Sequence, residues 1–147
     1  MSTTMMAQAY GRTYRSNAVL TASPGQLVLM LYDGALRSLA LARDAFERGE
    51  NMPQRFEVIN RELLKAQAII AELQGGLNFS AGGEVAPTLD QLYDYYNRRI
   101  FEANLRKELN PVVEVEGLLN QLRASWAEML TAPAVNEPRP ELMRGVA

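Results

Sequence analysis

The sequence predicts an all-α protein, an antiparallel up-down-up-down four-helix bundle with a flexible N-terminal arm and a flexible C-terminal tail. In each of four segments of similar length, apolar residues recur every three or four positions, as on the buried face of a helix. No segment shows the strict alternation of a strand, and short connections between the segments favour antiparallel neighbours. We expect an arm over residues 1–22, the bundle over 23–130 and a tail over 131–147.

The first helix is expected from Pro24 to about Arg48. Ser23 can accept from an amide of the first turn, Gln26 can reach back to it, and a proline fits the first turn without losing a hydrogen bond. Gly49 marks its end. The inward stripe is predicted to be Val28, Leu31, Ala35, Leu39, Ala42 and Phe46.

The second helix is expected to begin with Pro53 in its first turn and to end at Gly75 and Gly76. Its inward stripe is the clearest periodic signal in the chain, because the apolar positions alternate between spacings of three and four. These positions are Phe56, Ile59, Leu63, Ala66, Ile70 and Leu73.

The third helix is expected from Glu84 to about Lys107, with Leu89, Leu92, Tyr96, Ile100 and Ala103 facing inward. The fourth is expected to start with Asn110 as a cap and Pro111 in the first turn, and to end near Leu130. Its inward stripe is Val115, Leu118, Leu122, Trp126 and Met129. Prolines at 133, 138 and 140 cannot lie in a helix interior, which is why the tail is predicted to start there.

Composition excludes several kinds of chemistry. The chain has 147 residues, 48% of them hydrophobic, with no Cys and no His, so disulfides, thiol nucleophiles, imidazole catalysis and the usual zinc and haem sites are excluded. We expect no cofactor and no metal. Fifteen basic residues against 17 acidic ones give a net charge of −2, which argues against nucleic acid as a partner. The absence of a long apolar run predicts no membrane insertion and a cytoplasmic protein.

Two acidic pairs are the only basis for an enzyme. Asp90 and Asp94 share a helix face, and Glu114 lies close to Glu116 in sequence, so either pair is an acid–base candidate in principle. No apolar surroundings and no electrophilic partner accompany them, and a solvated helix face is the more common explanation. The sequence therefore predicts no enzyme.

The first and third predicted helices carry more apolar residues than one buried stripe needs. The second and fourth helices are conventional. The surplus residues are Leu27, Leu29, Met30, Tyr32, Leu36 and Leu41 on the first helix and Tyr93, Tyr95, Phe101 and Leu105 on the third. Most of them, such as Leu36, Tyr93 and Phe101, are expected to thicken the core. The remainder predicts a groove for a helix or an extended segment of another protein.

Several runs resemble the flagellar export chaperones of the FliS family. They are Val19–Pro24 and Met30–Ala35 near the start, Gly82–Ala86 and Leu92–Tyr95 in the centre, and Val115–Leu119 with Leu122–Trp126 near the end. The resemblance covers residues 8 to 130, and the matching runs follow one another along the chain in the same order as in the family. Pro87 and Thr88, and the loop 78–80, depart from the family pattern.

The resemblance implies a cytosolic chaperone that binds the disordered C-terminal segment of flagellin, prevents its premature polymerisation and delivers it to the flagellar export gate. It also implies that the first segment, with Tyr10, covers the binding surface until a partner displaces it. A helical adaptor or anti-factor with another client is the alternative, and weak pairing of two copies stays open. The expected partner-binding residues are Tyr10, Leu27, Met30, Leu31, Tyr32, Leu92, Tyr93, Tyr96, Ile100 and Asn104. For Asn104 two alternatives stay open, a hydrogen bond to the client backbone or one within the chain.

Overall fold

The computed structural model describes residues 20–132, and this part of the chain is helical with no strand. The long helices are α2 (Pro24–Arg48), α3 (Arg55–Gly75), α4 (Val85–Arg106) and α5 (Asn110–Thr131). Two short 3₁₀ turns, η1 (Gly49–Asn51) and η2 (Phe79–Ala81), lie in the first two connections. The predicted all-α class is confirmed. The predicted arm and tail fall almost entirely outside the described residues.

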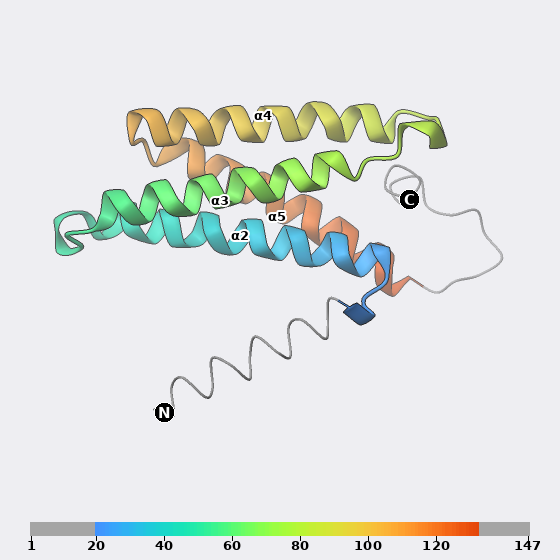
Figure 1. The fold of residues 1–147 in the computed structure, drawn as a ribbon, viewed down its shortest axis with the longest axis horizontal. Coiled ribbons are helices and arrows are strands. Elements are labelled where there is room, and N and C mark those ends of the chain that lie inside the picture. The colour runs from blue at the N-terminus through green and yellow to red at the C-terminus, as the bar shows by residue number, and fades with distance from the viewer. Residues whose placement is uncertain (1–19, 133–147) are drawn as a thin grey trace, which may run out of the picture.

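The four helices form an up-down-up-down bundle (Figure 1). Successive helices run in opposite directions, and each packs against its two neighbours around the bundle, with α5 closing it against α2. Consequently α3 lies between α2 and α4, and the start of α2 meets the end of α5 at one end of the molecule. The seam between α3 and α4 therefore runs along the outside of the bundle.

The helix ends follow local chemistry, with two differences from the prediction. Ser23 and Gln26 form the predicted capping box, with hydrogen bonds of 3.2 and 3.1 Å, and Gly49 takes the positive φ of 55° that ends α2. Pro53, however, precedes α3, which begins at Arg55. Asn110 is the first residue of α5 rather than its cap, and no side chain caps that helix.

The core lies along the predicted stripes, with one correction. The ring of Phe56, predicted to face inward, is 52% exposed because it lies near the open end of α3, where the Arg55 guanidinium covers it at 4.6 Å from the ring centre. Ile59 is buried as predicted, and Val58, which is not in the predicted stripe, packs partly buried against the core. The largest fully buried side chains come from all four helices, namely Tyr32 and Leu39, Ile59, Leu63 and Ile70, Tyr93 and Ile100, and Val112, Val115, Leu119 and Trp126.

Two buried phenols connect opposite helices across the core. The hydroxyls of Tyr32 on α2 and Tyr93 on α4 lie 2.6 Å apart, and both side chains are 1% exposed. Burial raises the pKa of Tyr32 to about 12, and burial with the neighbouring Tyr32 also raises the pKa of Tyr93 above its ordinary 10. One hydroxyl donates to the other, so each phenol oxygen takes part in a hydrogen bond in a region otherwise apolar.

This pair predicts a loss of stability in alkali. An unfolded tyrosine ionises near pH 10, so the stabilisation by the neutral pair is complete below about pH 10 and is lost as the pH rises through about 12. Replacing both residues with Phe removes both partners of the hydrogen bond and should change stability little at neutral pH. Urea unfolding from neutral pH to about pH 12 should then show a smaller alkaline loss in the double variant. Equal losses in both proteins would contradict this role for the pair.

Candidate functional site

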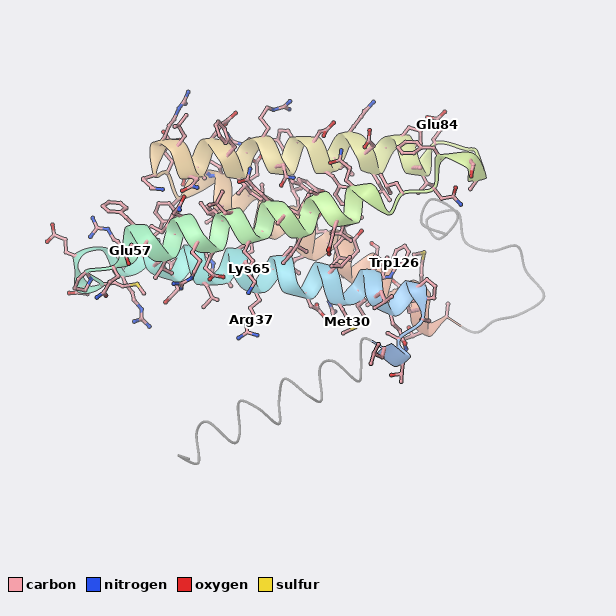
Figure 2. All side chains as sticks on the ribbon, in the orientation of Figure 1. Met30, Arg37, Glu57, Lys65, Glu84 and Trp126 are labelled. Atoms are coloured by element: carbon pink, nitrogen blue, oxygen red, sulfur yellow. The ribbon has the colours of Figure 1, made fainter. Side chains whose placement is uncertain are left out.

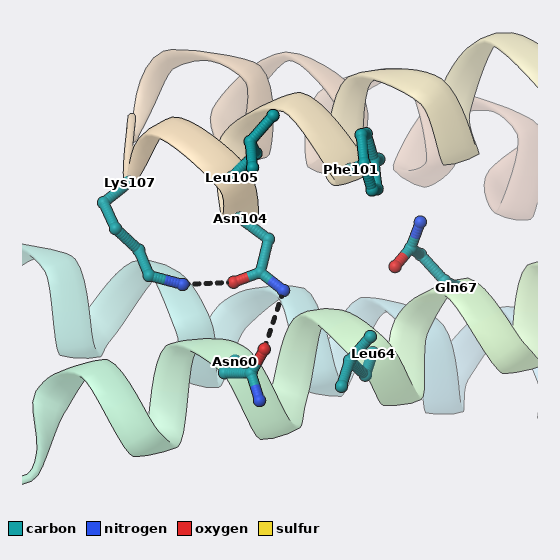
Figure 3. A pocket seen from close by; sticks show the side chains of 7 residues that line it. All are labelled: Asn60, Leu64, Gln67, Phe101, Asn104, Leu105 and Lys107. Carbon is teal, nitrogen blue, oxygen red and sulfur yellow. Dashed lines mark hydrogen bonds between the residues drawn. The ribbon is translucent and has the colours of Figure 1, made fainter.

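A groove of about 370 Å³ lies along the seam between α3 and α4 (Figure 3). Three large apolar side chains in it are mostly in solvent, with Leu64 52%, Phe101 57% and Leu105 70% exposed. Polar side chains that can form hydrogen bonds surround them. The groove is lined by Asn60, Leu64, Gln67, Phe101, Asn104, Leu105 and Lys107.

Helical periodicity places these residues on the outside of the bundle. On α4, Ile100 and Ala103 point into the core, so Phe101 and Asn104, each one position later, face the seam. On α3 the same relation holds between buried Leu63 and exposed Leu64. The groove is thus a direct consequence of the core stripes beside it.

Amide side chains bridge the two helices along this seam. Asn104 Nδ2 donates to Asn60 Oδ1 at 3.0 Å (Figure 3). Seven residues away on each helix, Gln67 Nε2 donates to the main-chain carbonyl of Asn97 at 3.2 Å. In return Asn97 Nδ2 donates to the main-chain carbonyl of Gln67 at 3.3 Å. These bridges hold α3 and α4 at the base of the groove in a fixed register.

A third bridge, seven residues further on, carries negative charge. Gln74 Nε2 donates to Asp90 Oδ1 at 2.9 Å and to Asp94 Oδ1 at 2.8 Å. We call the three bridges, Asn60–Asn104, Gln67–Asn97 and Gln74–Asp90/Asp94, the amide ladder. Its acidic end lies where α4 begins, and its other end lies in the groove.

Lys107 stands at the groove end of the ladder. It follows α4 in the left-handed backbone conformation, with φ 54° and ψ 52°, and its Nζ donates to Asn104 Oδ1. Burial lowers the pKa of its ammonium group below the ordinary 10.5. Asn104 thus uses its amide nitrogen and its amide oxygen within the chain, which is the second of the two alternatives expected for it.

The structure divides the predicted partner-binding residues into three groups. Asn104 lines the groove, and Leu27, Met30 and Leu31 on α2 and Leu92 on α4 are at least partly exposed, as Figure 2 shows for Met30. Tyr10 lies outside the described residues. The remaining four are buried in the core at 3% exposure or less and do not form part of the surface, which corrects the expected placement; they are Tyr32, Tyr93, Tyr96 and Ile100.

Sequence reasoning missed the apolar residues that do line the groove. Phe101 and Leu105 belong to the apolar surplus expected on the third helix, but the expected place of Phe101 is the thickened core, and neither residue is among the expected partner-binding residues. Leu64 had no such signal, because the second helix was judged conventional. The useful signal was the run Phe56, Asn60 and Leu64 at spacings of four, which marks an exposed stripe beside the buried one.

Of the two acidic pairs considered for catalysis, Asp90 and Asp94 lie together, where both accept from Gln74 Nε2, whereas Glu114 and Glu116 face different helices. Glu114 faces α4, where it accepts from Tyr95 Oη and Arg99 Nε, both at 2.7 Å, and these two hydrogen bonds lower the pKa of its carboxyl. Glu116 faces α2 and pairs with Arg43 at 2.7 Å. Both carboxylates connect neighbouring helices. Within residues 20–132, no group of three or more acidic side chains is placed to hold a metal ion.

Comparison with known proteins identifies the family. The profile of "Flagellar protein FliS" matches residues 6–133. The flagellar secretion chaperone FliS of Salmonella typhimurium is 38% identical over 140 residues, which is 95% of this chain and 100% of the relative. The protein of the same name from Bacillus subtilis is 38% identical over 80% of this chain and 83% of its own length. That from Escherichia coli K12 is 37% identical over 87% of this chain and 91% of its own length.

No helix within residues 20–132 has both the length and the apolar character that crossing a membrane requires. An all-helical bundle, a match over nearly the whole chain and several relatives above 30% identity lead to one conclusion. This chain is a member of the FliS family of flagellar secretion chaperones.

Proposed function

We propose that this chain is a cytoplasmic export chaperone that binds the C-terminal segment of flagellin in the groove between α3 and α4 and delivers it to the flagellar export gate. The observation that carries the proposal is the exposure of Leu64, Phe101 and Leu105 side by side on a chaperone of this family. Exposed apolar clusters of this kind are typical of surfaces that bind another protein.

The size of the apolar surface suits a client that orders on binding. Complete burial of a large apolar side chain contributes about 1.5–3 kcal/mol, and these three are already partly covered. Ordering a disordered segment costs about 2–5 kcal/mol. Burial of these three side chains therefore offsets the cost of ordering the client. Hydrogen bonds between the client and the polar side chains of the seam, together with contact between the client and exposed Phe56, then supply the net affinity. Such a complex holds its client without a chemical step and releases it by competition.

Calorimetric titration of a peptide with the sequence of the C-terminal segment of flagellin tests the proposal. We expect a stoichiometric complex and a negative heat-capacity change, because the apolar groove is removed from water. A peptide of the same composition in scrambled order is the control and should give only heats of dilution. No heat and no spectral shift with the authentic peptide at concentrations on the order of micromolar would refute the proposal.

A further inference from the structure

We propose that the side-chain amine of Lys107, at one end of the groove between α3 and α4, is a modification site that accepts an acyl group from an acyl phosphate such as acetyl phosphate. This covalent chemistry goes beyond the proposed function, which needs no chemical step. Three features of Lys107 support the site: its backbone conformation, the neutral partner of its amine, and its partial burial in the groove.

The backbone of Lys107 has a conformation that glycine usually adopts at the end of a helix. Within residues 20–132 it is the only residue other than glycine with a positive φ. Its amide and that of Glu108 both donate to the Ala103 carbonyl, the second at 3.1 Å. A side chain in this conformation is under steric strain that glycine avoids. The strain is accepted here with a long side chain that runs along the seam to Asn104 (Figure 3).

The amine of Lys107 has a neutral hydrogen-bond partner. Its Nζ donates to the amide oxygen of Asn104. Five arginines of the described chain pair instead with a carboxylate, namely Arg43, Arg48, Arg61, Arg99 and Arg123. A carboxylate strongly favours the charged form of a basic group, whereas an amide fixes its position with a weaker effect on its charge. The amine is thus held in place without an ion pair.

The charged residues around Lys107 do not pair with it. Two are basic and two are acidic, and they lie next to it in sequence or within one turn of Asn60 on α3; they are Arg106, Arg61, Glu108 and Glu57. None of them forms an ion pair with Lys107, and Arg61 is paired with Glu62. Burial is therefore what lowers the pKa of the Lys107 ammonium group below its ordinary 10.5.

A lysine with these properties is a better nucleophile near neutral pH, because more of its amine is neutral. The lone pair of Nζ attacks the carbonyl carbon of acetyl phosphate and forms a C–N bond. The C–O bond to the phosphate breaks, and its electron pair leaves with the phosphate, which also takes the proton lost from Nζ. The products are an acetylated Lys107 and inorganic phosphate, and no oxidant or reductant is needed.

Acetylation would change the end of the groove. It removes the positive charge of Lys107 and adds a small uncharged group to a surface that Leu105 and Asn104 also line. An effect on client binding rests on the proposed function, because the client is proposed to lie in this groove. The acetylation itself does not depend on the client.

The chain contains its own reference for a test, because Lys65 is its only other lysine. Lys65 is exposed on α3 and does not line the groove. The full chain is incubated with acetyl phosphate at about pH 8, and mass spectrometry follows the acetylation of each lysine with time. We expect Lys107 to react at least about threefold faster than Lys65. Equal rates, or a faster reaction at Lys65, would overturn the assignment.

A variant and an unfolded control test the physical cause. Asn104→Asp keeps the shape of the side chain but places a carboxylate beside Nζ, so acetylation of Lys107 should slow at least about threefold while that of Lys65 is unchanged. In the chain unfolded by urea, the two lysines should react within about twofold of each other.

Two further outcomes would contradict the site. One is an Asn104→Asp protein with native circular dichroism whose Lys107 reacts as fast as in the native chain. The other is a preference for Lys107 that survives unfolding, because it would arise from the neighbours in sequence and not from the groove. These experiments contain no flagellin peptide, so their failure leaves the proposed function standing, and failure of the calorimetric titration leaves the modification site standing.

Discussion

Replacing Leu64 and Phe101 together with aspartate is expected to weaken binding of the C-terminal flagellin segment by about 100-fold or more. The change removes two large apolar contacts and forces two carboxylates to lose water when the client binds. Because the native side chains are 52% and 57% exposed, the bundle itself should stay folded. Calorimetric titration measures the affinity, and circular dichroism checks the helical content.

Leu41→Asp is the matched control for this prediction. Leu41 is a helical leucine, 43% exposed on α2 and away from the α3–α4 seam, so its replacement should leave affinity within about twofold of the native protein. If the control weakened binding as much as the groove variant, or if the groove variant bound normally, the client would have to lie on another face.

Replacing Trp126 with alanine is expected to destabilise the bundle by about 3–5 kcal/mol. The indole is 1% exposed, packs edge-on against Tyr32 with ring centres 6.5 Å apart, and donates from Nε1 to the Gly25 carbonyl at 2.7 Å. It thereby connects the end of α5 to the start of α2. Against a typical domain stability of about 5–15 kcal/mol this is a large loss.

Urea unfolding followed by circular dichroism measures this effect. Trp126→Phe keeps most of the volume but loses the hydrogen bond, so we expect an intermediate loss of about 1–2 kcal/mol. Phe79→Ala removes an aromatic ring that is 55% exposed in the α3–α4 connection and should cost less than about 1 kcal/mol. A Trp126→Ala protein as stable as the Phe79→Ala protein would mean that the indole does not hold the two helices together.

The four helices could be predicted from the sequence because the position of each depends largely on local signals. The Ser23–Gln26 capping box and the Gly49 stop give α2 the bounds that were predicted. Local signals failed at Pro53 and Asn110, where a proline or a capping residue is compatible with more than one helix start. They also failed at Phe56, since a periodic position near a helix end has no partner helix to cover it.

The site was harder to predict because it depends on how two helices are paired. Tyr32 and Tyr93 are 61 residues apart, and nothing local shows that their hydroxyls meet inside the core. The amides at 60 and 67, and those at 97 and 104, have the same spacing of seven in the sequence. Only the antiparallel register of α3 against α4 brings them together as bridges with Leu64 and Phe101 between them.

Methyl NMR of the full chain with and without the flagellin segment tests the placement of the client most directly. Leucines at 64 and 105 report on the groove, and those at 27 and 41 report on the outer face of α2; all four are exposed in the free protein. We expect the methyl signals of Leu64 and Leu105 to shift on binding while those of Leu27 and Leu41 stay in place. Shifts confined to Leu27 and Leu41 would show that the client binds α2 and that the α3–α4 groove is not its site.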